Sequence, residues 1–196
     1  MLRSKLGVNT DPRVGAREAS VCTVPQVEAK GFMERNHMRG HTNGTFYDGL
    51  IAPDGNLCAV LITTQTGPTY RIDRYATDRA VVGGFGKLLE VLKRRVSENG
   101  GGTIVTFSDN EVSDGHLYAR TGFALDGELP PDYSYLVDGR RTHKFNYRLS
   151  RFRTDPALVY REGMSEAQLA ELNHLPRVWD SGKRRWKLHV QDAMPH

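Results

Sequence analysis

Cysteine is scarce in this sequence, with only Cys22 and Cys58 among 196 residues. Neither belongs to a Cys-x-x-Cys pair or to a Cys–His spacing, so a zinc site built on cysteine is not expected. We expect both thiols to be small core side chains of a protein that works in a reducing cytoplasm.

Long apolar segments are also missing. The longest run, LCAVLI, starts at Leu57 and is far too short to span a bilayer. The first fifteen residues lack the apolar core of a signal peptide. These absences predict a soluble, cytoplasmic protein with no membrane partner, and they leave its oligomeric state open.

Acidic residues are sparse in the last part of the chain. The whole sequence carries a net charge of +4, but residues 139–196 contain twelve Lys or Arg against six Asp or Glu. A basic flank favours a polyanionic partner such as DNA. Solubility alone is the other explanation, and composition does not choose between them.

Strand signals and helix signals are interleaved along the chain. TFYDGLIA and LCAVLITT, separated by the turn signal PDGN, predict a hairpin, and residues 69–77 predict a third strand. An amphipathic helix follows, with an apolar stripe on Phe85, Leu88, Leu89, Leu92 and Val96.

The rest of the chain continues in the same manner. A buried strand is predicted at 102–109 and a short helix at 115–120, followed by the strand-like stretches FALDGEL, YSYLV and HKFNYRL. Ser165 begins a further helix with a capping-box pattern. This order predicts an α/β (α+β) fold with a central mixed sheet flanked by helices. We expect one domain over residues 18–150 and a small basic C-terminal extension over residues 151–196.

The glycine turn VVGGFG stands directly before the amphipathic helix. It is neither a G-x-G-x-x-G motif nor a P-loop, because Leu88 follows Lys87 where a P-loop has Ser or Thr. A strand, a glycine turn and a helix N-terminus can still bind a pyrophosphate through backbone amides. This predicts a cofactor site at Val82, Gly83, Gly84, Phe85, Gly86 and Lys87; a tight turn that packs the helix on the sheet is the alternative.

The stretch SDNEVSDGHLYARTGF contains a second group of candidate residues. Asp109 ends a strand at the edge where ligand crevices form, and Tyr118 follows in a short helix as a candidate general acid. A right-handed crossover makes the strands before and after the glycine helix parallel neighbours, so Arg74 should share the cleft. The alternative is an Asp that caps the helix and a Tyr whose ring is core.

The pieces VVGGFGKLLEVL and HLYARTGF, in this order and at this distance, resemble the GCN5-related N-acetyltransferase (GNAT) fold. The resemblance implies that the glycine turn and its helix hold the pyrophosphate of acyl-coenzyme A. It also implies that Tyr118 protonates the departing thiolate. The same marks occur in members of the family that no longer transfer acetyl groups.

A narrower resemblance covers residues 31–188. The strings FMERNHMRGH, RIDRYAT, VVGGFGKL, FSDNEVSDGHLYARTGF, PPDYSYLVDGRRTHKF and RVWDSG are similar to those of the Mom-like proteins of bacteriophages. This implies addition of an acetamido-type group to the exocyclic amine of a base flipped out of double-stranded DNA, which protects phage DNA from restriction. It implies catalytic roles for Arg74, Asp109 and Tyr118, and places His37 near the cleft. Glycines replace a serine of the Mom turn, which leaves substrate and product open. An acetamido group is linked through carbon, so simple acetyl transfer from acetyl-coenzyme A cannot make it. The donor expected here is acyl-coenzyme A or another activated group.

Arginines and aromatic residues interleave between Asp132 and Arg153. Cations for phosphates and rings for stacking are typical of a surface that holds a nucleic-acid strand. We expect contacts to substrate or DNA from Asn36, Ser108, Tyr133, Arg140, Arg141 and Lys144. A strand with its charges turned to solvent is the alternative.

His37 and His41 are four residues apart, a spacing that can place two metal ligands on one helix face, with Asp109 or His116 as further ligands. Gly40 indicates that the helix has ended by that point. Histidines that hydrogen-bond a loop are therefore favoured, and no metal is predicted. Three functions remain, in this order: a DNA base-modifying enzyme, an acyl-coenzyme A N-acyltransferase on a small amine or protein, and a DNA-binding module without catalysis.

Overall fold

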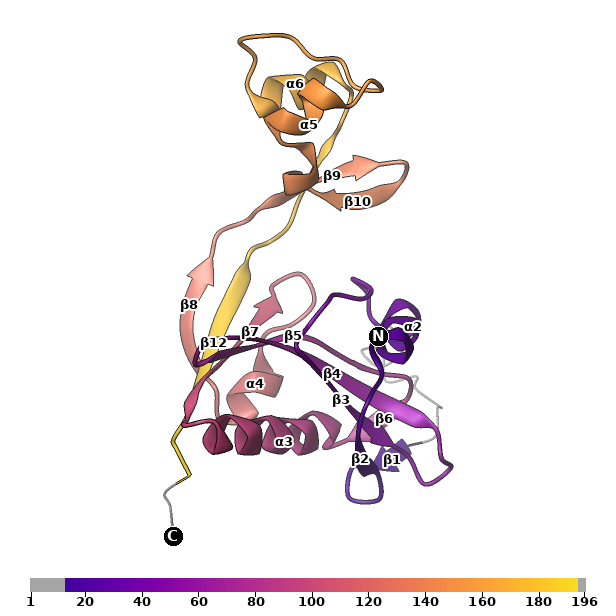
Figure 1. Ribbon diagram of the computed structural model, residues 1–196, viewed down its shortest axis with the longest axis vertical. Coiled ribbons are helices and arrows are strands. Elements are labelled where there is room, and N and C mark those ends of the chain that lie inside the picture. Colours follow the sequence, from indigo (N-terminus) through magenta and orange to yellow (C-terminus); the bar gives the residue numbers. More distant parts are fainter. Residues whose placement is uncertain (1–12, 194–196) are drawn as a thin grey trace. The chain divides into compact units, whose positions relative to one another are not determined.

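The computed structural model describes residues 13–193, and its elements follow the predicted order along most of the chain (Figure 1). The strands are β1 (Arg13–Gly15), β2 (Ser20–Thr23), β3 (Phe46–Ile51), β4 (Leu57–Thr66), β5 (Thr69–Thr77), β6 (Ala80–Val82), β7 (Gly102–Asp109), β8 (Ala124–Leu129), β9 (Tyr133–Val137), β10 (Arg140–His143), β11 (Arg177–Trp179) and β12 (Lys183–Val190). The helices are α2 (Gln26–Asn36), α3 (Gly84–Glu98), α4 (His116–Arg120), the 3-10 helix η1 (Lys144–Tyr147), α5 (Leu149–Thr154) and α6 (Glu166–Leu172).

A seven-stranded sheet forms the centre of the fold, in the order β2-β3-β4-β5-β7-β12-β8. The strands from β2 to β5 pair antiparallel with their neighbours, whereas β5 and β7 are parallel. The predicted fold class, a mixed α/β fold with a central mixed sheet and flanking helices, is confirmed. The prediction that the strands on either side of the glycine helix are parallel neighbours is confirmed as well.

The two faces of the sheet bury different helices. Alternate residues of β4 point to opposite faces. Leu61 packs with the apolar stripe of α3, whereas Ile62 packs with Phe32 and Met33 of α2. The sheet is therefore a middle layer between α3 on one face and α2 on the other.

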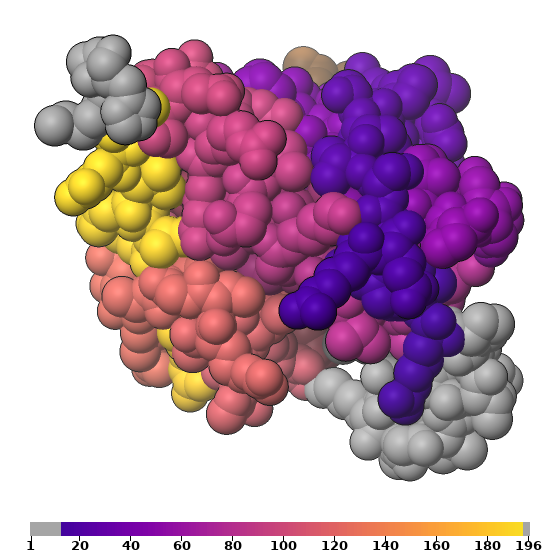
Figure 2. Space-filling view, turned by 90° about the horizontal axis from the view of Figure 1, so that it is seen from below, coloured from indigo at the N-terminus to yellow at the C-terminus, as the bar shows by residue number. Residues whose placement is uncertain are grey.

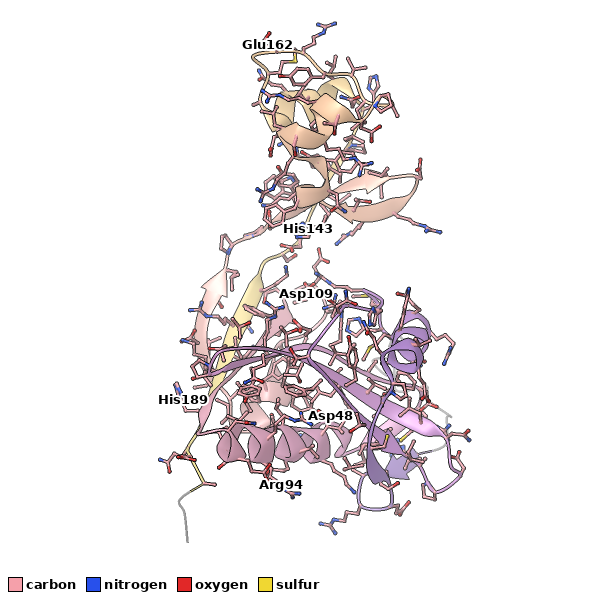
Figure 3. The ribbon with its side chains drawn as sticks, in the orientation of Figure 1. Asp48, Arg94, Asp109, His143, Glu162 and His189 are labelled. Carbon is pink, nitrogen blue, oxygen red and sulfur yellow. The ribbon has the colours of Figure 1, made fainter. Side chains whose placement is uncertain are left out.

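A buried ion pair fastens α3 to the sheet. Asp48 of β3 is directed toward the helix (Figure 3) and receives two hydrogen bonds from the Arg95 guanidinium, each of 2.7 Å. The side chain of Asp48 is 4% exposed. Arg95 also lies over the Phe46 ring, 4.3 Å from its centroid. A buried carboxylate needs such a partner, because desolvation penalises an isolated charge.

The N-terminal segment lies against the start of α3. β1 pairs in parallel with β6, and Ala16 N–H donates to the Val82 carbonyl at 2.8 Å. The Lys87 ammonium donates to the carbonyls of Ala16 and Ala19. Figure 2 shows this face, with the N-terminal segment in indigo beside the pink surface of the helix.

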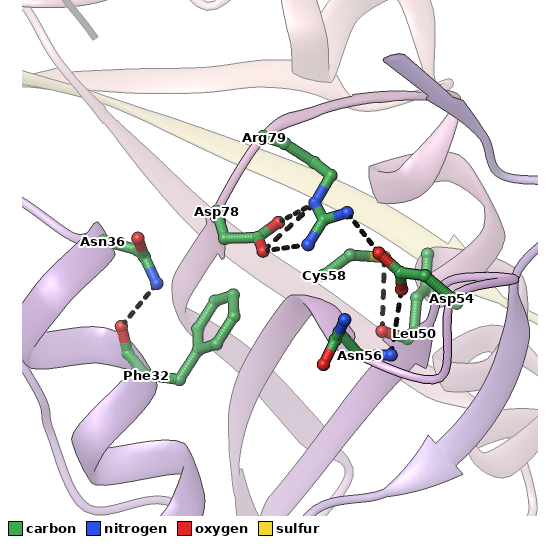
Figure 4. Close-up of polar contacts among 8 residues, drawn as sticks. All are labelled: Phe32, Asn36, Leu50, Asp54, Asn56, Cys58, Asp78 and Arg79. Carbon is green, nitrogen blue, oxygen red and sulfur yellow. Dashed lines mark hydrogen bonds and ion pairs between the residues drawn. The ribbon is translucent and has the colours of Figure 1, made fainter. Parts of the chain in front are cut away.

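Short polar contacts hold the hairpin and the end of α2 (Figure 4). Arg79 donates to both Asp78 and Asp54, with 2.7 Å between Nη1 and Asp54 Oδ2. The buried Cys58 thiol donates to the Leu50 carbonyl at 3.3 Å, and burial raises its pKa. Cys58 is thus a core residue, as predicted, whereas Cys22 is half-buried.

The chain divides into two compact units. Among the described residues, the first contains 13–107, 117–126 and 186–193; the second contains 108–116 and 127–185. The second unit has its own core around Tyr135, Tyr147, Phe152 and Leu169. The predicted boundary at residue 150 falls inside α5, and β12 returns to the seven-stranded sheet. The compact units therefore do not follow the predicted division at residues 150 and 151.

One predicted strand is absent, and several elements were not predicted, among them β1, β6, β10, α5 and β11. The stretch HKFNYRL is not a strand. Its first residue, His143, ends the short β10, and Lys144–Tyr147 form the 3-10 helix η1. The strand β12 was not predicted at all. Within residues 13–193, no helix is long and apolar enough to cross a membrane.

Candidate active site

The parallel strands β5 and β7 pair only at their beginnings. Three pairs join them, Thr69 with Thr103, Tyr70 with Ile104, and Arg71 with Val105. Both strands continue beyond these pairs, and β5 keeps its other partner, β4, as far as Thr77. The two strands therefore diverge after Arg71 and Val105. Within residues 13–193, this leaves the β7-facing edge of β5 without a partner strand from Ile72 onward.

A β-bulge lies where the divergence begins. Ile62 of β4 pairs with Arg74, but the next residue, Thr63, pairs with Ile72, so Asp73 is the extra residue. The Asp73 carboxylate accepts hydrogen bonds from Thr64 Oγ1 and Arg71 Nε, each at 2.5 Å. Bulges bend a strand and re-aim its side chains, and they are common next to active sites.

Tyr118 of α4 reaches the point of divergence through Thr106. The buried Thr106 hydroxyl donates to the Ile72 carbonyl at 3.4 Å, directly after the last β5–β7 pair. Burial raises the pKa of Tyr118, and the nearby Thr106 side chain opposes this shift. The hydroxyl is therefore protonated at neutral pH.

The ring of Tyr118 is held by aromatic neighbours. Its centroid lies 5.6 Å from Phe85, 5.7 Å from Phe123 and 6.1 Å from Trp186. Such edge-on contacts fix the ring in the α3-side core. The two roles expected for Tyr118, a core ring and a candidate acid, are therefore compatible. The ring is packed in the core, while the hydroxyl lies at the diverging strands.

The glycine turn has the geometry of an anion site. Gly83 precedes α3 with φ +77°, and Gly84 has no room for a side chain because a Cβ would lie 2.8 Å from the Tyr75 hydroxyl. A Cβ on Gly86 would meet no atom within 4 Å. The first N–H groups of a helix have no intrahelical partner. That of Phe85 lies near the Tyr75 hydroxyl and opposes the rise in its pKa that burial causes. Within residues 13–193, those of Gly84 and Gly86 remain for a ligand.

The side chains of three residues predicted to bind the cofactor have other surroundings. The Lys87 ammonium is bound to carbonyls of the N-terminal segment, so its side chain is directed away from a ligand of the turn. Val82 is exposed and its carbonyl accepts from Ala16. Phe85 is a buried core ring. Any contribution of Lys87 and Phe85 to binding would come from their backbone.

Arg74 and His37 lie together on the α2 side of the sheet. Arg74 Nε donates to the Gly40 carbonyl at 3.3 Å, and its Nη1 donates to the Asp73 carbonyl at 2.7 Å. The pKa of His37 is lowered to about 4, first by burial and then by the charges of Arg74 and Arg39. His37 is therefore neutral at pH 7. Its Nδ1 accepts from Arg39 N–H at 3.1 Å, and the Asn36 amide donates to the Phe32 carbonyl within α2.

Asp109 and Ser108 belong to the second unit. The Asp109 carboxylate accepts from Glu111 N–H at 3.1 Å, and its carbonyl accepts from Val112 and Ser113. Asp109 thus shapes the turn that follows β7 (Figure 3). Arg74, His37 and Tyr118 belong to the first unit, whereas Asp109 does not. Its catalytic role, and a substrate contact by the buried Ser108, stay predictions.

Apart from Asn36 of α2, the residues predicted to contact substrate or DNA lie on the second unit. Lys144 is 5.1 Å from the Tyr133 centroid and 6.0 Å from that of Phe145, and its ammonium donates to Asp132. We call the continuous set of Tyr133, Lys144, Phe145, Arg148, Arg177 and Trp179 the aromatic–cation strip. Arg141 precedes Lys144 in the sequence but is not part of the strip. Its Nη1 lies 3.6 Å from Glu111 Oε2.

Metal ligands do not gather in the described part of the chain. Among residues 13–193, no three His, Cys, Asp or Glu side chains form a group that could hold a metal ion. His41, the alternative ligand beside His37, has its ring stacked on Tyr47 with centroids 6.3 Å apart. Its backbone N–H donates to Glu34 Oε1 at 3.1 Å.

Thr106 and Tyr75 are site residues that sequence reasoning missed. Thr is a common residue in strands, so Thr106 gives no signal of its own. Tyr75 follows Arg74 in an ordinary strand pattern. The position of Thr106 beside Tyr118 and that of Tyr75 beside the glycine turn become visible only once the pairing of β5 with β7 is known. That pairing joins distant segments of the chain.

Known proteins resemble this chain in structure but not in sequence. No protein-family model and no curated protein matches it. The ribosomal-protein-S18-alanine N-acetyltransferase from Escherichia coli is similar with a TM-score of 0.54 and 14% identity, over 89% of this chain and 96% of that one. Ard1 from Thermoplasma volcanium has a TM-score of 0.53 and 10% identity, over 89% and 99%. The spermidine/spermine N-acetyltransferase SpeG from Vibrio cholerae has a TM-score of 0.53 and 11% identity, over 89% and 94%.

Likeness at such low identity concerns the fold. The chain has the fold of the GCN5-related N-acetyltransferases, which confirms the broader of the two resemblances. None of these structures points to DNA modification, so the narrower, Mom-like interpretation has no support from them.

Proposed function

We propose that this protein is an acyl-coenzyme A-dependent N-acyltransferase that acts on a small amine or on an amine of a protein. The observation that carries the proposal is the divergence of β5 from β7, with the Tyr118–Thr106 pair at its apex. The glycine turn at the start of α3 adds an anion site on the same face of the sheet as Tyr118. N-acetyltransferases with the same fold support the same class of reaction.

The residues of the first unit fit an acyl-coenzyme A donor. The N–H groups of Gly84 and Gly86, with no acidic residue in the first turn of α3, suit a pyrophosphate. The open space at Gly86 leaves room for it. The free edge of β5 beyond Ile72 offers backbone groups to an extended, amide-containing arm, as a strand edge does for a peptide.

The site also supplies the proton that acyl transfer requires. Acyl-coenzyme A provides an acyl group that is activated as a thioester. When an amine nitrogen takes over this group, the C–S bond breaks and the thiolate needs a proton. The Tyr118 hydroxyl holds one at neutral pH, because burial raises its pKa. The attacking amine releases its own proton to water or to a base.

We expect Gly86→Val to weaken the binding of acetyl-coenzyme A at least ~10-fold, which corresponds to about 1.4 kcal/mol. The new side chain enters the space where the pyrophosphate would lie, and it contacts no protein atom at its Cβ. Isothermal titration calorimetry measures the loss. The thermal midpoint should not fall, because valine is no worse than glycine inside a helix.

Gly31→Val is the matched control. Gly31 also lies in a helix, and a Cβ there would meet only the end of Arg35 at 3.4 Å. This variant should bind the donor as the wild type does. Gly84→Val is unsuitable because it would collide with Tyr75 and Val81. Unchanged donor binding by Gly86→Val would leave the glycine turn with a purely structural role.

The acceptor separates the proposed function from the Mom-like one. Release of the coenzyme A thiol should be measured with polyamines, amino acids, peptides with free N-termini, and DNA. Turnover on one of the amines supports the proposal. A new nucleoside mass in DNA from cells that express the protein would instead support base modification.

The aromatic–cation strip favours nucleic-acid binding as a second candidate function. Trp179 and Phe145 are 56% and 58% exposed. Arg177 lies 5.4 Å from the Tyr133 centroid, and Arg148 lies 4.3 Å from that of Phe145. Rings for base stacking and cations for phosphates are the usual components of a single-strand surface. We propose that this strip contacts nucleic acid, whether or not the first unit modifies it.

Trp179→Ala and Phe145→Ala should each weaken the binding of a fluorescent single-stranded oligonucleotide by roughly 1–3 kcal/mol. Replacing Arg140, Arg141 and Lys144 together should flatten the salt dependence, because each lost phosphate contact lowers its slope by about 0.7. Anisotropy titrations at several salt concentrations, on single and double strands, measure both. Val159→Ala, an exposed apolar residue outside the strip, is the control. Binding that is absent at low salt, or insensitive to salt, would remove this candidate.

A further inference from the structure

Arg74 differs from the other partly buried arginines of the first unit. Arg95 is paired with Asp48, and Arg79 is paired with Asp54 and Asp78. The Arg74 guanidinium instead donates to two backbone carbonyls, those of Gly40 and Asp73. Within residues 13–193 it has no carboxylate at ion-pair distance, although the Asp73 carboxylate is next to it in sequence. That carboxylate is engaged by Arg71 and Thr64.

The surroundings of Arg74 are positive rather than negative. Burial lowers its pKa most, and the charge of Arg39 lowers it further, against a smaller opposing effect of Asp73. Arg39 and Arg74 also lower the pKa of His37. Arg74 and the neutral His37 thus share one half-buried region, beside the exposed Arg39. An unpaired cation in such a place costs stability, and it is compensated when an anion binds there.

The position of Arg74 connects it with the acceptor rather than with the donor. It follows the bulge at Asp73, where β5 leaves β7. Its partner Gly40 belongs to the loop after α2, on the sheet face opposite α3. The glycine turn and Tyr118 lie on the α3 face. A donor held by the glycine turn therefore approaches the diverging strands from one face, which leaves the Arg74 face for the amine.

We infer that Arg74 binds an oxyanion, a carboxylate or a phosphate, carried by the amine that this enzyme acylates. The neutral His37 can add a hydrogen bond, since its Nδ1 accepts from Arg39 and its proton is therefore on Nε2. Arg74 is a substrate-binding residue here, not an acid or a base. The inference rests on the proposed function and narrows its substrate class from amines in general to amines that bear an acidic group.

Thermal unfolding tests the inference without any turnover. In the wild type, inorganic phosphate added at constant ionic strength should raise the midpoint by about 2–4 °C, the shift that roughly 1 kcal/mol produces in a chain of this size. In the Gly86→Val background, which lacks the phosphate site of the glycine turn, Arg74→Gln should abolish this rise. Without phosphate the midpoint of Arg74→Gln alone should equal or exceed that of the wild type, because the change removes an unpaired, half-buried charge. A structural arginine would behave in the opposite way, with a lower midpoint.

Two further variants separate the sites. Gly86→Val removes the phosphate site of the glycine turn, so a rise that persists in this variant belongs to Arg74. Arg95→Gln deprives Asp48 of its partner, so its midpoint should fall. If phosphate stabilises Arg74→Gln in the Gly86→Val background as it does Gly86→Val alone, or if Arg74→Gln is destabilised like Arg95→Gln, the inference is wrong. If the wild type does not bind acetyl-coenzyme A, the proposed function is wrong instead.

Matched acceptors identify the anion. Thiol release should be compared for β-alanine against propylamine, and for phosphoethanolamine against ethanolamine. We expect a KM at least ~10-fold lower for the anionic member of one pair, the value of a single charge-assisted contact. The pair that shows the preference distinguishes carboxylate from phosphate, and Arg74→Gln should lose it. Equal KM values within both pairs, together with no phosphate effect on the midpoint, would overturn the inference.

Discussion

Tyr118→Phe is expected to lower kcat for acyl transfer by at least ~10²-fold, the usual loss when a general acid is removed. The phenyl ring keeps its contacts with Phe85, Phe123 and Trp186, so the fold and the binding of the donor should be unchanged. Thiol-release kinetics and calorimetry together measure the two effects. Thr106→Val should show a weaker loss of the same kind, because it removes the hydroxyl that orients Tyr118.

The pH profile gives a second measure of the same role. Burial raises the pKa of Tyr118 above its ordinary value of 10.0, so the acid form persists through neutral and mildly alkaline pH. The alkaline decline of kcat should therefore begin above pH 10 in the wild type. Tyr160→Phe, a change in the second unit, should leave both kcat and the profile unchanged. If Tyr118→Phe turns over like the wild type with its fold intact, a module without this catalysis becomes the better explanation.

Asp48→Ala is expected to lower the free energy of unfolding by about 3 kcal/mol, near the lower end for breaking a buried ion pair. The Arg95 side chain remains 23% exposed and can turn partly to water, which keeps the loss from being larger. In a chain of this length the midpoint should fall by roughly 6–12 °C. Thermal denaturation followed by circular dichroism measures the shift.

The exposed pair of Glu90 and Lys93 on the same helix provides the comparison. Their charged atoms are 2.7 Å apart, but Glu90 is 67% exposed. Glu90→Ala should barely move the midpoint, since water solvates both charges once the pair is broken. Equal effects of Asp48→Ala and Glu90→Ala would mean that the Asp48–Arg95 pair does not fasten α3 to the sheet.

Local signals were enough to locate most elements of the fold. The strand predicted at residues 69–77 is β5, and that at 102–109 is β7. The predicted capping box is confirmed, because Ser165 Oγ accepts from Gln168 N–H while Gln168 Oε1 accepts from Ser165 N–H. These features depend on neighbouring residues, and such information is present in a single sequence.

Most features that depend on distant pairing were not predictable in this way, although the parallel pairing of β5 with β7 was predicted. β12 lies between β7 and β8, and nothing in RRWKLHV indicates which strands it joins. The same holds for the site. Tyr118 and the glycine turn were predicted from local motifs, whereas Thr106 has meaning only because β5 and β7 part beside it. Asp109 was assigned from its place at a strand end, and that end belongs to the other compact unit.

The larger segment of the second unit, residues 127–185, begins and ends on neighbouring strands, since the chain leaves the large sheet after β8 and returns as β12, and these two are adjacent in it. In topological terms this is a β-hairpin whose turn has been replaced by a self-contained module with its own core. Such a connection can be lengthened, exchanged or trimmed back to a tight turn without rerouting any other strand. Evolution can therefore change the module independently of the enzyme fold, and a trimmed chain would retain every residue of the diverging strands, the glycine turn and the Arg74 region.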